Sequence, residues 1–103
     1  MKTYPCLIIL LLLSFVNDIN SQETINGTLM HDNIEREYIL YVPASYDSQV
    51  ETSLLFNFHG YTSNAFQQML YGSFTSIADE EGFLIVHPEG TEDLSGTTHF
   101  NVG

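Results

Sequence analysis

Two neighbouring segments, residues 23–30 and 34–42, are predicted to be strands, and the polar residues 31–33 between them indicate a turn. Successive side chains of a strand point to opposite faces. The two faces of the second segment carry Tyr38, Leu40 and Val42, and Glu37, Ile39 and Tyr41. The pattern predicts an antiparallel hairpin that ends at Pro43, because proline has no N–H for the ladder.

Two later segments, 54–58 and 83–87, are almost continuously apolar. Such runs are typical of strands buried on both faces, as in parallel sheets. Between them, residues 64–81 place apolar side chains at helical spacing, at Phe66, Met69, Leu70, Phe74, Ile77 and Ala78. The pattern therefore changes from strand to helix and back to strand.

Local signals mark the start, middle and end of the helical segment. Asn64 with Gln67 three residues later resembles a capping box. Gly72 predicts a kink or two short helices in place of one rod. Gly82 predicts the helix end, since glycine readily adopts the left-handed conformation found there.

Residues 52–87 thus predict one strand–helix–strand unit with two parallel strands, and residues 89–103 predict a loop. A parallel sheet needs further strands and a helix layer on each face. So few elements bury too little apolar surface to offset a chain entropy of roughly 1.5 kcal/mol per residue. We therefore expect an α/β fold with an incomplete sheet, in which residues 22–103 begin a larger domain cut short in a truncated reading frame or gene fragment.

The first 21 residues have the layout of a cleaved secretory signal peptide. Lys2 is followed by the apolar block 7–16, which is shorter than the roughly 20 residues that span a bilayer. We expect cleavage after Ser21 and a secreted product, extracellular or periplasmic. Cys6 is the only cysteine and lies in this segment, so the mature chain offers no disulfide and no thiol chemistry.

The charge is strongly one-sided: 13 acidic residues face only Lys2 and Arg36, a formal net charge of −11. Such a surface repels nucleic acid and anionic lipid, so neither is expected as a partner. Solubility in an extracellular setting is the plain interpretation of this charge. A calcium site is the alternative, but no Asp-x-Asp-x-Asp-Gly run supports it.

The main chemical signal is His59-Gly60-Tyr61, directly after the first buried strand. Active sites of open α/β sheets form at the carboxyl ends of the strands. In α/β-hydrolases the loop at this place supplies one backbone N–H of the oxyanion hole. Gly60 would let the backbone turn and approach a substrate, Tyr61 would offer its N–H, and His59 would brace the loop. A glycine turn after a core strand with a satisfied histidine is the structural alternative.

Four motifs, in order, resemble those of secreted polyhydroxybutyrate depolymerase-like esterases, relatives of feruloyl and acetyl-xylan esterases. They are the Arg-x-Tyr-x-Leu-x-x-Pro strand at 36–43, the strand to His-Gly at 54–60, the Ala-Asp-x-x-Gly-Phe to Pro-Glu-Gly stretch at 78–90, and the aromatic-Asn-x-Gly of 100–103. The resemblance covers residues 34–103. It implies the N-terminal part of an α/β-hydrolase fold and a Ser-His-Asp esterase that hydrolyses ester-linked polymers or their fragments without a cofactor.

The sequence departs from that family at the nucleophile. No Gly-x-Ser-x-Gly is present, and Gly72-Ser73-Phe74 lacks both the second glycine and a preceding buried strand. Because the family's order is Ser, Asp, His, we expect all three beyond residue 103 and no activity from this chain alone. Only the oxyanion loop, His59, Gly60 and Tyr61, is assigned a site role, and an ester substrate is expected only of a longer protein.

The other polar candidates have plain structural interpretations. His31, His87 and His99 are expected to be surface or structural residues, and their spacing does not predict a metal site with His59. The acidic loop of Glu89, Glu92 and Asp93 is expected to be solvated, with contact to substrate hydroxyls as the alternative. Asn26-Gly27-Thr28 matches a glycosylation sequon.

Two rival hypotheses remain open. The chain would be a small secreted binding module if Tyr38, Tyr41 and Tyr46 formed an exposed aromatic face, or a pseudoenzyme if the longer protein lacked the triad. The oligomeric state and the particular ester stay open as well.

Overall fold

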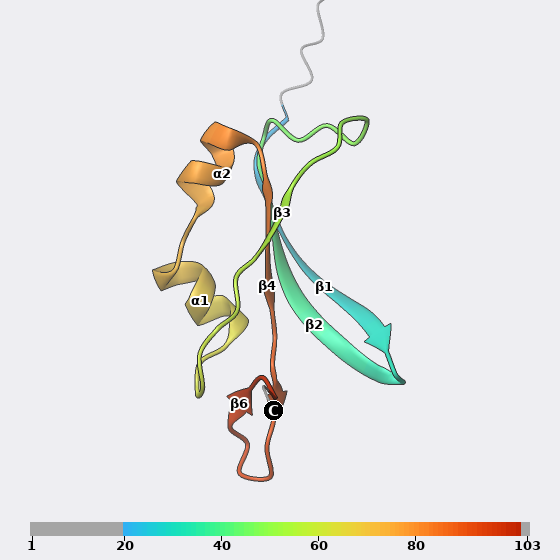
Figure 1. The fold of residues 1–103 in the computed structure, drawn as a ribbon, viewed down its shortest axis with the longest axis vertical. Helices are drawn as coiled ribbons and strands as arrows, with labels where there is room; N and C mark the ends of the chain where they lie inside the picture. Colours follow the sequence, from blue (N-terminus) through green and yellow to red (C-terminus); the bar gives the residue numbers. More distant parts are fainter. Residues whose placement is uncertain (1–19, 102–103) are drawn as a thin grey trace, which may run out of the picture.

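The computed structural model describes residues 20–101, so the predicted signal peptide lies almost entirely outside the described residues. The strands and helices are β1 (Glu23–His31), β2 (Ile34–Val42), β3 (Leu54–Phe56), α1 (Ala65–Tyr71), α2 (Thr75–Glu81), β4 (Leu84–Pro88), β5 (Thr91–Glu92) and β6 (Thr98–His99). Four strands form a sheet in the order β1-β2-β4-β3, and β5 pairs with β6 (Figure 1).

The predicted hairpin is confirmed. β1 and β2 pair antiparallel over their whole length, from Glu23 opposite Val42 to His31 opposite Ile34. Asp32 and Asn33 form the two-residue turn, with φ of 50° and 60°. Two positive φ values in succession match the twist of the strands, and aspartate and asparagine tolerate them better than most residues.

The strand–helix–strand unit is confirmed as well. β3 and β4 pair in parallel, from Leu54 opposite Leu84 to Phe56 opposite Val86. The Asn64 side chain caps α1 by accepting the Gln67 N–H at 2.9 Å. The helical stretch divides at Gly72 into two seven-residue helices, and Gly82 ends the second with a φ of 73°.

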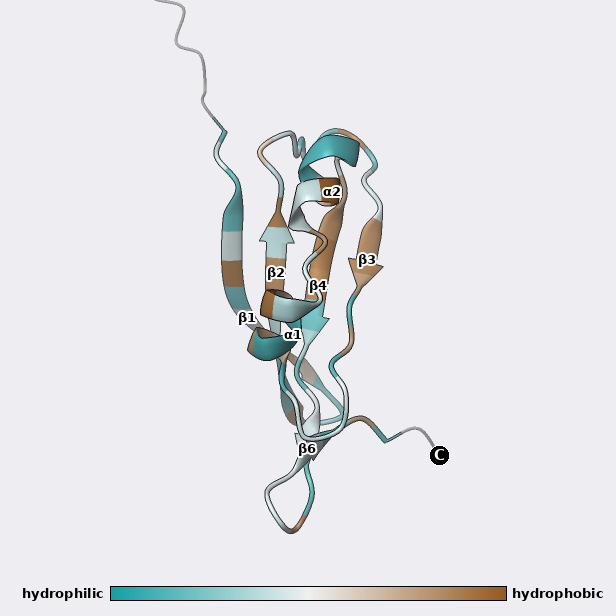
Figure 2. Cartoon of the chain, turned by 90° about the vertical axis from the view of Figure 1, so that its left-hand side faces the viewer, coloured by the Kyte–Doolittle hydropathy of each residue, from teal (hydrophilic) through white to brown (hydrophobic). Residues whose placement is uncertain are grey.

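Both helices lie on one face of the sheet (Figures 1 and 2). Beneath them Tyr41, Ala78 and Ile85 form the core, with Leu55 and Phe83 packed around it. The Tyr41 hydroxyl donates to Asp79 at 2.6 Å, which ties α2 to β2. The strand period thus sends Ile39 and Tyr41 into the core and leaves Tyr38 half-buried on the opposite face.

The prediction that residues 54–58 are buried on both faces is wrong for the described residues. Leu54, Phe56 and Phe58 are 46%, 56% and 55% exposed. The residues between them face the helices, because Leu55 packs against the core and the Asn57 side chain donates to the Gly72 carbonyl. Among residues 20–101 no helix lies on the opposite side of the sheet (Figure 1). An apolar sequence shows that a strand can be buried on both faces, but it becomes buried only where other elements pack against both faces of the sheet.

The expected loop 89–103 also needs correction, because β5 and β6 form a small hairpin within it. The Asp93 side chain accepts the N–H groups of Ser95 and Thr97 at 2.8 and 2.9 Å, and Gly96 turns the chain with a φ of 78°. These hydrogen bonds hold the pKa of Asp93 below its usual value, the Ser95 hydroxyl being the largest cause. An aspartate-nucleated turn needs no hydrophobic period to form.

No common tyrosine face exists for a binding module. Tyr41 is buried in the core, Tyr38 lies on the other face of the same strand over Gly27, and Tyr46 lies in the loop after β2. The aromatic surface that this rival hypothesis required is therefore absent from residues 20–101.

We predict that Tyr41→Phe destabilises the protein by about 1 kcal/mol, the net contribution of one such hydrogen bond. Burial, followed by the Asp79 contact, raises the pKa of Tyr41 to about 12. A raised native pKa gives stability that is complete below pH about 10 and is lost as the pH rises towards 12. Urea unfolding across that range checks this, with Tyr38→Phe as control. Equal alkaline slopes in wild type and Tyr41→Phe would contradict it.

His87 gives a second prediction, in acid. Its side chain is 1% exposed, neither ring nitrogen has a partner within residues 20–101, and burial lowers its pKa. The unfolded chain then binds the proton more readily, so stability falls as the pH drops below about 6.5. We expect His87→Leu to weaken this acid loss, whereas His31→Gln, at an exposed position, leaves it unchanged. Unfolding midpoints at pH 7.5 and 5 measure both effects.

Candidate active-site loop

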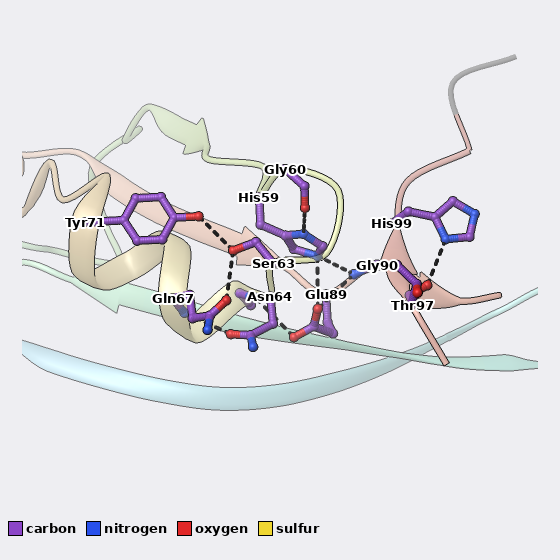
Figure 3. A network of polar contacts seen from close by, with 11 residues as sticks. His59, Gly60, Ser63, Asn64, Gln67, Tyr71, Glu89, Gly90, Thr97 and His99 are labelled. Carbon is purple, nitrogen blue, oxygen red and sulfur yellow. Dashed lines mark hydrogen bonds and ion pairs between the residues drawn. The ribbon is translucent and has the colours of Figure 1, made fainter. Parts of the chain in front are cut away.

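Because β3 and β4 are parallel, the loops that follow them leave the sheet at the same edge. The loop after β3 carries His59, Gly60 and Tyr61, and the segment after β4 carries Glu89 and Gly90. Figure 3 shows the side chains of His59 and Glu89 directed toward each other across this edge. The site is therefore built from two segments that only the fold brings together.

His59 is 4% exposed, and both of its ring nitrogens are occupied. Nδ1 lies 2.8 Å from the Gly60 carbonyl oxygen and can only donate to it. Nε2 lies 3.0 Å from the Gly90 nitrogen and 3.0 Å from Glu89 Oε1. An imidazole held in this way braces the loop and has no nitrogen free to take a proton from a nucleophile.

Glu89 is the residue whose role the sequence did not indicate. The solvated loop expected there is instead a junction, in which Oε1 contacts His59 and accepts the Gly90 N–H at 3.2 Å. Oε2 accepts the N–H of Ala65, the first residue of α1, at 3.1 Å. A Pro-Glu-Gly sequence at the end of a strand beside the His-Gly strand is the one signal that pointed to it.

The turn itself differs from the expected one. The positive φ of this loop falls on Thr62, at 70°, and not on Gly60. The Thr62 N–H donates to the Thr98 carbonyl at 3.1 Å, and the Ser63 N–H donates to the Gly60 carbonyl at 3.1 Å. A Cβ at Gly60 would have no atom within 4 Å, so glycine here keeps open space in front of the loop.

Tyr61 lies between these anchored residues. Its ring is exposed, and its backbone N–H donates no hydrogen bond within the part of the chain that the structure describes. A fixed loop with an N–H still available and no side chain at the preceding residue has the properties of a donor for a developing oxyanion.

A cavity of about 650 Å³ adjoins the loop. It is lined by Phe58, His59, Tyr61, His99, Phe100 and Asn101. Phe100 packs against Phe58 at 5.0 Å and against the His59 ring at 4.7 Å between ring centroids. The cavity beside Tyr61 is therefore walled mainly by aromatic rings, which suits an apolar or aromatic ligand group.

No serine of the described chain is placed as a nucleophile. The Ser63 hydroxyl contacts the Gln67 side chain at 3.1 Å and the Tyr71 hydroxyl at 2.7 Å. Ser73 lies between α1 and α2, with its hydroxyl 3.0 Å from that of Thr75. A nucleophile elbow joins a strand to a helix, so neither serine has the required setting.

The remaining candidates lie apart from the loop or only border it. His31 contacts Asp32 on the surface, and His99 contacts the Thr97 carbonyl at the cavity rim. Residues 20–101 hold no group of three histidine, cysteine or acidic side chains that could bind a metal. No helix in that range has the length and apolar character needed to cross a bilayer. Asn26 of the sequon is exposed on β1.

Comparison with family models and with curated proteins gave no match. Among solved structures, a ferulic acid esterase superposes with a TM-score of 0.55 at 20% sequence identity. The match covers 66% of this chain and 30% of the esterase, so this chain spans less than a third of that protein's length. The likeness is one of fold alone, and together with the mixed sheet it is compatible with a partial α/β fold.

We predict that alanine at Gly90 destabilises the protein, whereas alanine at Gly60 does not. At Gly90 a Cβ would lie 2.4 Å from the His99 carbonyl oxygen, a backbone atom that cannot move aside cheaply. Gly90→Ala should lower the free energy of unfolding by about 1–3 kcal/mol, as overpacking does. Gly60→Ala should leave it unchanged, and a loss equal to that of Gly90→Ala would show that the loop is packed otherwise. Urea unfolding of both variants provides the measurement.

Proposed function

We propose that this chain is the N-terminal, oxyanion-loop part of a secreted serine esterase with an α/β-hydrolase fold. The observation that carries the proposal is the available Tyr61 N–H, in a loop fixed by His59 and open in front of Gly60. The superposition on a ferulic acid esterase supports an esterase fold at low identity.

Ester hydrolysis by a serine esterase requires a hydrogen-bond donor for the oxyanion. When a hydroxyl attacks an ester carbonyl, the carbonyl oxygen becomes negative in the tetrahedral intermediate. A backbone N–H that is held in place beforehand stabilises this charge without reorganisation. The hydrogen bonds of Gly60, Thr62 and Ser63 fix the backbone on both sides of Tyr61, so little entropy is lost when its N–H engages the oxyanion.

The substrate proposed is a carboxylic ester of the polyester or plant-polysaccharide type. The aromatic cavity beside Tyr61 would hold the apolar part of such an ester, and no cofactor enters the scheme. Under this proposal the serine nucleophile and its histidine and aspartate partners lie in other sequence. The chain has no Gly-x-Ser-x-Gly, and within residues 20–101 His59 and Ser63 are both engaged in other contacts.

We predict that Tyr61→Pro, in the protein encoded by the complete gene, lowers kcat for a chromogenic ester such as p-nitrophenyl acetate by about 10²–10³-fold, the effect of losing one oxyanion donor. Proline removes the N–H, which makes no hydrogen bond within residues 20–101. Tyr61→Ala is the matched control, because it removes the ring and keeps the N–H.

Steady-state kinetics and far-UV circular dichroism of the folded variants distinguish the outcomes. Full activity of a folded Tyr61→Pro protein would rule out this donor. Equal losses in both variants would assign the effect to the ring and its cavity. A wild-type gene product without esterase activity would overturn the proposed function itself.

A further inference from the structure

We propose that Glu89 is a positioning residue that holds the Tyr61 N–H in place through His59 and Ala65. This inference rests on the proposed function for its effect on catalysis. The arrangement of the loop on which it depends stands on the contacts of the described residues alone.

One carboxylate holds both ends of the segment that contains Tyr61. Oε1 contacts His59 Nε2 at 3.0 Å, at the start of the segment, and Oε2 accepts the Ala65 N–H at 3.1 Å, at its end. Glu89 itself follows β4, and its own N–H donates to the Glu37 carbonyl of β2 at 2.9 Å. The loop is therefore fastened to the sheet at two points by a single side chain (Figure 3).

The Gly90 N–H lies between His59 and Glu89 and links them. It donates to Nε2 of His59 at 3.0 Å and to Oε1 of Glu89 at 3.2 Å, while Nδ1 of His59 donates to the Gly60 carbonyl. Nε2 and Oε1 are themselves 3.0 Å apart. The three groups therefore form one junction at the start of the segment that contains Tyr61.

The junction is shielded on the His59 side, because that side chain has no solvent-exposed surface, whereas that of Glu89 is 25% exposed. The Glu89 carboxylate accepts two backbone N–H groups, that of Gly90 at Oε1 and that of Ala65 at Oε2. Glutamine fits the same space but has only one acceptor oxygen, so it cannot accept from both N–H groups at these two positions.

The test uses Glu89→Gln in the protein encoded by the complete gene. We expect the ¹⁵N resonances of the His59 ring to shift in histidine-labelled protein, because the group beside Nε2 moves, and the Tyr61 amide to exchange faster with solvent. For the chromogenic ester we expect kcat to fall by about 10–10²-fold with an unchanged KM, because a loosened oxyanion donor loses part of its effect.

Two control variants separate positioning from general stability. Glu92→Gln removes a carboxylate from exposed β5 that makes no side-chain hydrogen bond within residues 20–101, and it should change nothing. Tyr41→Phe removes the hydrogen bond between β2 and α2 and touches no residue of the loop. It should lower the unfolding midpoint and leave the His59 resonances and kcat unchanged.

The outcomes decide the proposal in either direction. Unchanged His59 resonances and unchanged Tyr61 exchange in Glu89→Gln would overturn it, as would an equal loss of kcat in Tyr41→Phe. If the wild-type protein hydrolyses no ester, the proposed function fails, yet the resonances and the exchange rate still report whether Glu89 holds the loop.

Discussion

The parallel pairing of β3 with β4 is the constraint on which the candidate site depends. It brings the ends of two strands, separated by both helices in sequence, to one edge of the sheet. Only there do His59 and Glu89 meet, at 3.0 Å. Helix α1 is also tied to this edge of the sheet. The Asn57 side chain, just after β3, donates to the Gly72 carbonyl and accepts a hydrogen bond from the Gln68 side chain. A change that weakens this pairing would therefore disturb the site before it disturbed the β1–β2 hairpin.

Local signals were enough to predict the strands β1 to β4 and both helices, but not the short β5–β6 hairpin. Tertiary contacts decided what remained. Asn64 and Gly82 predicted helix ends because capping depends on a few neighbouring residues. His59-Gly60 could be singled out because it follows an apolar strand. Glu89 could not, because its partners lie at the ends of other elements and an acidic residue after a strand is usually solvated. The uncovered face of β3 escaped prediction for a related reason, since an apolar run does not tell what packs against it.

The left-handed backbone conformation of Thr62 costs free energy, and the hydrogen bonds of the loop offset that cost. Thr62 has a φ of 70°, which costs a β-branched residue on the order of 1–3 kcal/mol. Its N–H pairs with Thr98 of β6, and the loop is further held by Ser63 and by Glu89. Gly60, the residue best suited to a left-handed conformation, is not used for it. Glycine at position 60, where no positive φ requires it, therefore leaves open space beside the loop, since a Cβ there would meet no atom within 4 Å.

Phe58 belongs both to the uncovered face of the sheet and to the wall of the cavity. The residues that fix the proposed oxyanion donor are therefore different from those that shape the ligand space. Phe58 stacks on Phe56, at 5.9 Å, in the exposed row and also lines the cavity through its contact with Phe100. Any layer that packs over Phe56 and Phe58 would therefore also close the cavity on that side. The proposed donor at Tyr61 is fixed by residues of this chain, whereas the shape of the ligand space depends on what covers β3. Under the proposed function, esterases that share this segment would keep one oxyanion geometry and differ in the esters they accept.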